Sequence, residues 1–161
     1  MFKAKNFRLL LITTLISSPI VYANPTPINK NLLKQPQEVA LAFERHFNAA
    51  NVNGLLALYS ENGIFVPQPK VQLNQPQEIR QALNQFMSMK LPIKVHVRQV
   101  YQSDDIALIV SDWSIIGKDP SGKPINIKGT GADVVKRDAD GAWRYVIDNP
   151  FGVALPNSEQ K

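Results

Sequence analysis

The sequence predicts an α+β fold, with N-terminal helices packed on a strongly curved antiparallel sheet. Apolar residues recur at helical spacing in the first half of the chain but alternate with polar residues in the second half. Turn signals rich in Gly, Asp and Pro separate the alternating segments. Gly129 and Gly131 fall inside one long strand, where glycine favours a bend. Helices followed by strands are typical of a helical layer on one face of a sheet.

Three helices are expected first. One runs from Pro36, which suits a first helical turn, to Ala50, with Val39, Phe43 and Phe47 on one face. A short second helix covers residues 55–59 and ends near residues 61–63. The third begins at Pro76 and ends before Pro92, and its apolar face carries Ile79, Leu83, Phe86 and Met87.

The expected strands are a short one at residues 64–66, a partner at 71–73, and four long antiparallel ones. The long strands start at Ile93, Ile106, Ile125 and Trp143. Residues 106–116 are almost continuously apolar, so both faces of this strand are expected to be covered. In the last strand, strict alternation places Tyr145, Ile147 and Asn149 on one face and Asp148 on the other.

The first 23 residues have the pattern of a secretory signal peptide. A basic segment, residues 1–8, precedes a short apolar run, and Val21-Tyr22-Ala23 fits a cleavage site, so cleavage is expected after Ala23. The apolar run is shorter than the ~20 residues that cross a bilayer as a helix. We therefore expect a periplasmic or secreted protein without a stable membrane anchor; a retained N-terminal anchor is the alternative. Residues 24–35 would form a flexible lead, residues 36–152 the folded domain and residues 153–161 a C-terminal tail.

Composition excludes several function classes. The formal charge is +5, and removal of Lys3, Lys5 and Arg8 with the signal peptide leaves +2. The remaining basic residues are scattered, whereas phosphate binding needs a clustered stripe, so no nucleic-acid partner is expected. The chain has no cysteine, which excludes disulfides and thiolate chemistry. His46 and His96 lie on different elements, so neither a metal nor another cofactor is expected.

One stretch carries a family resemblance. Residues 42–69, AFERHFNAANVNGLLALYSENGIFVPQP, resemble the opening of the nuclear transport factor 2-like superfamily, which includes ketosteroid isomerases and SnoaL-like cyclases. Asp112-Trp113, the G-x-G-x-D-V strand at 129–134 and the D-G-x-W-R ending at 140–144 resemble an exported bacterial branch of SnoaL-like proteins. The resemblance implies a cone-shaped domain with a pocket at its wide end, and a homodimer formed through the outer sheet face.

The ketosteroid isomerase pattern is incomplete in this chain. The family's helical tyrosine falls on Phe43, and its base carboxylate falls at Val66 or Pro67. Only the protonated oxyanion-hole Asp has a match, Asp133. Loss of one oxyanion donor costs about 3 kcal/mol or more, and loss of the base removes the proton-transfer step. The mechanism of that isomerase is therefore not expected here.

Asp133, Asp112 and His96 are the candidates for acid or base chemistry. Asp133 lies among apolar neighbours, so it is paired with a cation such as Arg98 or Arg144, solvated, or kept protonated by a raised pKa. Trp113 is either a core or dimer-surface residue or a ligand platform. Asp148 and Asn149 close the last strand before Pro150. They either lie at the pocket rim or cap the turn.

These residues favour an exported small-molecule-binding domain. Apolar walls with few polar groups are the usual form of such sites. The expected ligand is a small apolar or carbonyl-containing molecule. One alternative is a SnoaL-like isomerase, dehydratase or cyclase using a pocket Asp or His; another is a dimeric assembly module without an open pocket. The expected ligand-binding residues are Phe43, Phe47, Tyr59, Phe65, Phe86, Trp113, Asp133, Asp148 and Asn149, with Asp112 as a further polar anchor.

Overall fold

A computed structural model describes residues 32–154. The helices come first in this part of the chain, interrupted by a short hairpin, and four strands follow. The helices are α1 (Gln37–Asn48), α2 (Val52–Leu56) and α3 (Pro76–Met87). The strands are β1 (Tyr59–Gln68), β2 (Val71–Leu73), β3 (Ile93–Ser103), β4 (Ile106–Lys118), β5 (Pro124–Arg137) and β6 (Trp143–Asp148).

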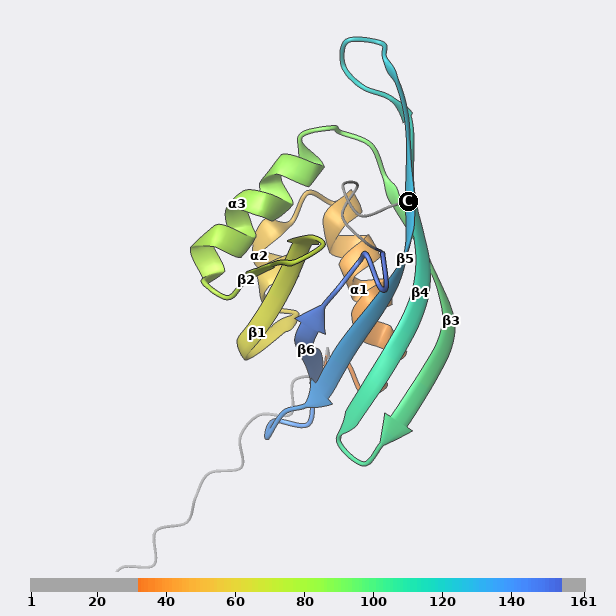
Figure 1. Cartoon of the computed structure of the whole chain (residues 1–161). Coiled ribbons are helices and arrows are strands. Elements are labelled where there is room, and N and C mark those ends of the chain that lie inside the picture. Colours follow the sequence, from red (N-terminus) through yellow and green to blue (C-terminus); the bar gives the residue numbers. More distant parts are fainter. Residues whose placement is uncertain (1–31, 155–161) are drawn as a thin grey trace, which may run out of the picture.

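The strands form one curved sheet in the order β2-β1-β6-β5-β4-β3. All neighbouring pairs are antiparallel except β1 and β6, which run parallel. Figure 1 shows the three helices on the inner, concave face of this sheet. The α+β prediction, with helices on a curved and mostly antiparallel sheet, is confirmed.

Local sequence explains where the helices begin. Glu38 accepts hydrogen bonds from the backbone N–H groups of Lys34 and Gln35, which fixes the chain entering α1. Asn51 caps α2 by accepting from the Gly54 N–H at 2.9 Å. Gly54 lies under the His46 ring, where a Cβ atom would meet Nδ1 at 2.3 Å. A side chain at position 54 would therefore require the His46 ring to move.

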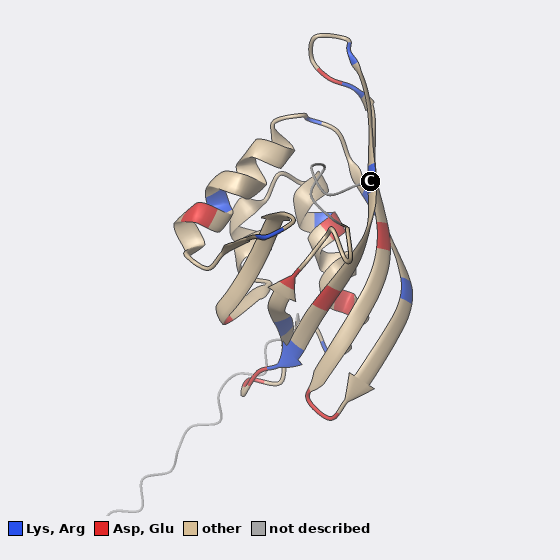
Figure 2. Ribbon diagram, viewed as in Figure 1, with Lys and Arg blue, Asp and Glu red and all other residues tan. Residues whose placement is uncertain are grey.

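The core fills the space between the helices and the concave face of the sheet. Val39, Leu55 and Leu83 come from the three helices and are almost completely buried. Ile109 and Trp143 face them from β4 and β6. Figure 2 shows charged residues distributed over helices, strands and loops around this core.

Two sequence predictions about individual elements are wrong. Tyr59 begins β1 rather than ending a helix, because it pairs in parallel register with Tyr145 of β6. The outer face of β4 is not covered by residues 32–154, since Ile106, Leu108 and Ile116 are 45%, 37% and 60% exposed. The nearly continuous apolar run in β4 therefore reflects a buried inner face and an apolar outer face that remains open.

The signal peptide expected over residues 1–23 lies outside the described residues, as do residues 24–31 of the expected lead and residues 155–161 of the expected tail. Within residues 32–154, none of the helices is long and apolar enough to span a membrane.

Candidate functional site

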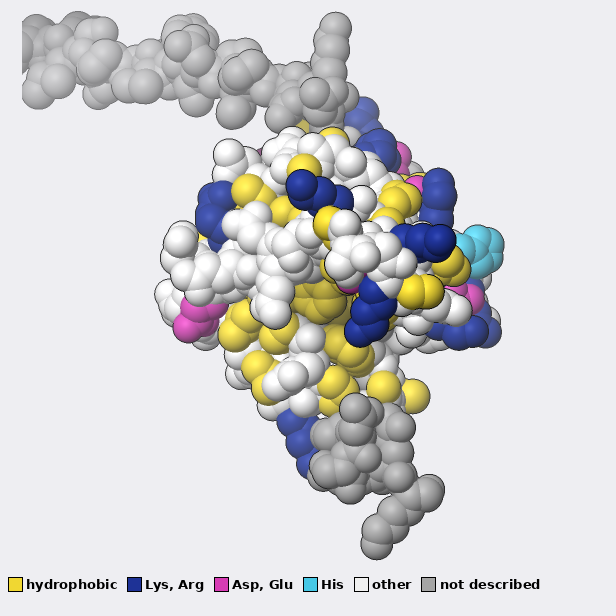
Figure 3. Space-filling model, turned by 90° about the horizontal axis from the view of Figure 1, so that it is seen from above, with side chains coloured by type: hydrophobic (Ala, Val, Ile, Leu, Met, Phe, Trp, Pro, Cys, Tyr) yellow, Lys and Arg dark blue, Asp and Glu magenta, His cyan; other side chains and the backbone are white. Residues whose placement is uncertain are grey.

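A cavity of about 70 Å³ lies between α1, α3 and the concave face of the sheet. Seven of its 17 lining residues are aromatic: Phe43, Phe47, Phe65, Phe86, Trp113, Tyr145 and Phe151. Figure 3 shows hydrophobic side chains gathered in a hollow at the upper end of the molecule. Because a cavity needs only about 10–15 Å³ of such space for one water molecule, this one has room for several waters or a small ligand.

Asp133 and Asp148 bring two carboxyl groups into this apolar cavity. Val134 pairs with Ile147, and the Ala132 N–H donates to the Asn149 carbonyl oxygen at 3.0 Å. Asp133 of β5 and Asp148 of β6 therefore stand directly opposite each other, and opposed residues of antiparallel strands share a sheet face.

An irregularity in β6 turns Asp148 inward. Val135 pairs with Tyr145 but Val134 pairs with Ile147, so Val146 is an extra residue in β6. Such a bulge shifts the alternation of side chains by one position. Asp148 therefore lies on the inner face with Trp143 and Tyr145, and the predicted placement on the opposite face is wrong.

Each carboxyl group has one protein donor. The Tyr59 hydroxyl donates a short hydrogen bond to Asp148 Oδ2, and the Asn149 backbone N–H donates to Asp133 Oδ1 at 2.9 Å. Neither forms an ion pair within residues 32–154. The two carboxyl groups are therefore buried together without a neutralising cation.

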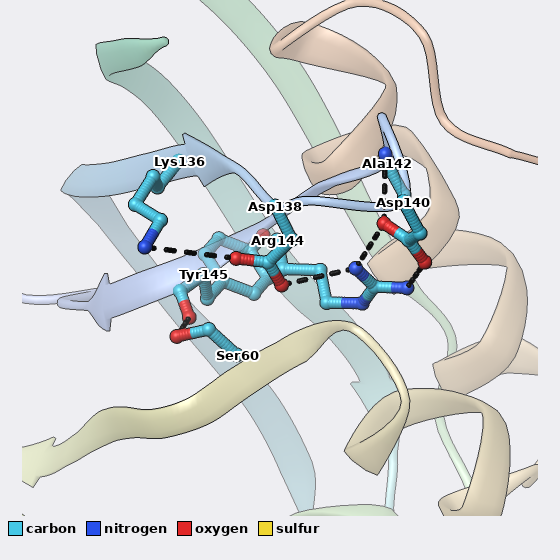
Figure 4. Close-up of polar contacts among 7 residues, drawn as sticks. All are labelled: Ser60, Lys136, Asp138, Asp140, Ala142, Arg144 and Tyr145. Carbon is cyan, nitrogen blue, oxygen red and sulfur yellow. Dashed lines mark hydrogen bonds and ion pairs between the residues drawn. The ribbon is translucent and has the colours of Figure 1, made fainter. Parts of the chain in front are cut away.

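The arginines expected to pair with Asp133 are bound elsewhere. Arg144 lies between Asp138 and Asp140, with Nη1–Oδ2 and Nη2–Oδ2 distances of 3.0 and 2.6 Å (Figure 4). Arg98 lies 3.4 Å from Asp112 on the outer face. The interpretation of Asp133 as one member of an ion pair is wrong, because local acids already bind both arginines.

Burial and mutual repulsion favour protons on the pair. Burial raises the pKa of Asp133 from 3.8 to about 7, and the Asn149 N–H lowers it by a smaller amount. Burial raises the pKa of Asp148 well above its usual value, the charge of Asp133 raises it further, and the Tyr59 hydroxyl lowers it. Because two opposed carboxylates cannot easily ionise together, the pair loses its first proton near neutral pH and holds the second one more tightly.

Three further polar atoms border the same space. Ser111 and Tyr145 line the cavity and are 4% and 3% exposed. Their hydroxyl groups and Asp133 Oδ2 have no hydrogen-bond partner within the described chain. Every polar side-chain atom there that is completely shielded from solvent does have a partner, so these three oxygens are not completely shielded. These oxygens therefore remain accessible from the cavity. Sequence reasoning did not assign Ser111 or Tyr145 to the site.

Trp113 is a cavity wall fixed by two contacts. Its Nε1–H donates to the Pro150 carbonyl oxygen at 2.7 Å, which ties β4 to the segment after β6. Its ring lies over Gly129, where a Cβ atom would approach within 2.9 Å. Glycine at position 129 thus makes room for the indole. At position 131, a Cβ atom would lie 3.4 Å from Ser111 Oγ and 3.5 Å from Asp133 Oδ2, so glycine there leaves space beside the two oxygens.

The remaining predicted site residues lie in different places. Asp112 and His96 pair across β3 and β4 on the outer face, where Asp112 accepts from Thr130 Oγ1 at 2.8 Å. They share a surface depression there and do not line the inner cavity. Asn149 caps the C-terminal turn, because its amide donates to the Gly152 carbonyl oxygen and its oxygen accepts from the Phe151 N–H. Tyr59 reaches the site through Asp148.

This arrangement has the elements of acid–base and hydrogen-bonding chemistry. A carboxyl pair that carries a single proton near neutral pH can accept a proton and can also donate one. The described residues contain no cluster of three or more potential metal ligands.

Comparisons with known proteins place this chain in a family. The family model described as SnoaL-like domain matches residues 40–146. A comparison with curated proteins gives no match. A Xanthomonas campestris protein provisionally assigned as a calcium/calmodulin-dependent protein kinase II association domain has 19% identity and a TM-score of 0.62, over 83% of this chain and 94% of that one.

Two further similar structures are of proteins described as ketosteroid isomerases or as similar to them. A Shewanella frigidimarina protein provisionally assigned as a ketosteroid isomerase has 17% identity and a TM-score of 0.60, over 70% of this chain and 91% of that one. A ketosteroid isomerase-like protein from Erwinia carotovora atroseptica has 16% identity and a TM-score of 0.59, over 79% of this chain and 100% of that one. At these identities the similarity establishes the shared fold.

Proposed function

Because this chain belongs to the SnoaL-like domain family, we propose that it binds a small, mainly apolar molecule in its aromatic cavity, anchored by Asp133 and Asp148. The observation that carries the proposal is the pair of opposed carboxyl groups in a cavity without a cation. Buried acids without a cation are costly to a fold, and such groups cluster at sites where a ligand or a reaction uses them.

The test is native mass spectrometry of the protein purified from a periplasmic extract of a bacterial expression host. We expect a mass above that of the polypeptide, from a co-purifying small molecule, and loss of that extra mass in Asp133→Asn. Asp112→Asn is the matched control, because Asp112 lies on the outer face. A bare polypeptide mass, even after incubation with a metabolite extract, would contradict the proposal.

Export is part of this proposal. The basic and apolar segments before Ala23 support it. The same spectrum provides the test, because cleavage after Ala23 gives a chain that begins at Asn24. An intact mass that includes residues 1–23 would contradict cleavage at this site.

The carboxyl pair also favours a second candidate function, acid–base catalysis of an isomerisation, dehydration or cyclisation. An ionised Asp133 would remove a proton from the ligand and the protonated Asp148 would return one. Once the ligand is identified, incubation in D2O tests this role. Deuterium at a ligand carbon after incubation with the wild-type protein, but not with Asp133→Asn, would support catalysis. Equal incorporation with both proteins would contradict it.

We also propose that a second copy of the chain covers the outer sheet face. Residues at paired positions form an apolar row across five strands: Tyr101, Leu108, Val134, Ile147 and Ile64. Tyr101 is 58% exposed and Leu108 37%. Leu108→Lys should convert a dimer to a monomer in light scattering after size-exclusion chromatography. A wild-type monomer at micromolar concentration would contradict the proposal.

A further inference from the structure

The cavity lacks positive charge. Asp133 and Asp148 are the charged residues among its lining side chains, and no Lys, Arg or His belongs to that lining. Nearby cations have other partners: Arg144 contacts Asp138 and Asp140, Arg98 contacts Asp112, and the Arg137 guanidinium lies 5.8 Å from the centre of the Trp143 ring. A buried carboxylate is stable when a positive charge pairs with it. Residues 32–154 supply none here.

The pair also lacks hydrogen-bond donors. Two carboxyl groups offer four oxygens, and the described chain donates to two of them, through the Tyr59 hydroxyl and the Asn149 N–H. Asp133 Oδ2 remains accessible from the cavity. A ligand that donates hydrogen bonds to the carboxyl pair would therefore find free acceptors in this cavity.

The aromatic wall suits a cation. Phe43 and Tyr145 pack edge to face with centroids 6.4 Å apart, and Phe65 and Phe86 pack similarly at 6.5 Å. Ring faces attract an ammonium group, and the attraction grows when water is excluded. Such walls also accept the apolar part of the same molecule.

We propose that the ligand of this cavity is an apolar primary amine, bound as an ammonium ion that donates to Asp133 and Asp148. This inference rests on the proposed binding function. A carbonyl ligand, the class expected from sequence, would accept a hydrogen bond from the shared proton but would leave the negative charge of the pair without a partner. An ammonium ion supplies both the missing charge and the missing donors.

The pH dependence of binding has a defined sign. The titratable side chains around Asp133 are Asp148 and Tyr145 on β6 and Tyr59 on β1, while the lining residues of α1, α3 and β3 are all apolar. Asp133 has a pKa of about 7 without ligand, and an ammonium partner lowers it. Binding near neutral pH therefore releases a proton, and amine affinity decreases as the pH falls below about 7.

Isothermal titration calorimetry of the full-length protein with three matched probes tests the inference: benzylamine, benzyl alcohol and benzaldehyde. We expect benzylamine to bind about tenfold or more tightly than the neutral probes at pH 8, from one charge-assisted hydrogen bond. Its affinity should fall by about a hundredfold between pH 8 and pH 5. The ammonium ion needs an ionised carboxylate, and at pH 5, about two pH units below the pKa of Asp133, only about one molecule in a hundred has one. The affinity of benzyl alcohol should change little.

Two variants and the neutral probes distinguish the amine assignment from the binding function on which it rests. Asp133→Asn should remove the preference for benzylamine, and Asp112→Asn on the outer face should preserve it. Neutral probes that bind as tightly as benzylamine would overturn the amine assignment and leave the binding function standing. Failure of all three probes to bind at millimolar concentration would overturn both.

Discussion

Asp133→Asn should stabilise the protein above neutral pH and leave it almost unchanged near pH 4. The folded-state pKa of about 7 lies above the ordinary value of 3.8, so the folded state binds more protons than the unfolded state between these values. The contribution of Asp133 to the free energy of unfolding is therefore greatest below about pH 4. It decreases as the pH rises and is completely lost above about pH 7.

The magnitude follows from the same two values. They differ by about three pH units, and each is worth about 1.4 kcal/mol, so ionisation of Asp133 costs up to roughly 4 kcal/mol at pH 8. Asparagine cannot ionise, and its side-chain oxygen can still accept from the Asn149 N–H. The variant should thus recover most of that free energy.

Urea unfolding at pH 4, 6 and 8 provides the measurement, with the slope m checked for constancy. Asp112→Asn serves as the control, because Asp112 is half-exposed and lies outside the cavity. Asp140 does not complicate the comparison: its pKa, lowered from 3.8 to about 2, makes both proteins less stable as the pH falls below about 5, and equally so. Wild-type and Asp133→Asn stabilities that run parallel from pH 4 to 8 would refute the reasoning.

Two other substitutions test the architecture of the site. Tyr59→Phe removes the hydroxyl that donates a hydrogen bond to Asp148. We expect the free energy of unfolding to fall by about 1–3 kcal/mol. An unchanged urea midpoint would contradict the role of this bond. Gly129→Ala places a Cβ atom within 2.9 Å of the Trp113 ring. The indole should move, which lowers the free energy of unfolding by about 1–3 kcal/mol and alters the near-ultraviolet circular dichroism signal. A wild-type spectrum would show that the ring tolerates the methyl group.

Much of the fold was predictable because it follows periodicity. Prolines at 36 and 76 and apolar residues spaced by three and four marked α1 and α3, and alternation marked the four long strands. The aromatic faces of the helices could be read in the same way, which is why Phe43, Phe47 and Phe86 were expected near the cavity, where the structure places them.

The inward turn of Asp148 was not predictable from alternation. The bulge at Val146 has no glycine or proline to mark it, and it depends on pairing with β5, which is distant in sequence. Tyr59 was expected at the site but on a helix, and its strand was missed for a similar reason, since that strand forms by parallel pairing with β6. The binding of Arg144 by Asp138 and Asp140 was readable in principle, because all three lie within one hairpin.

The extra residue in β6 separates the direction of a side chain from its place in the count along the strand. Without Val146, Tyr145 would still pair with Val135 and Ile147 with Val134, so Asp148 would still stand opposite Asp133 on the inner face. A relative that lacks this residue would therefore keep the inward acid one position nearer to the start of the strand. Functional residues of this strand are best compared between relatives by the β5 residue that they oppose.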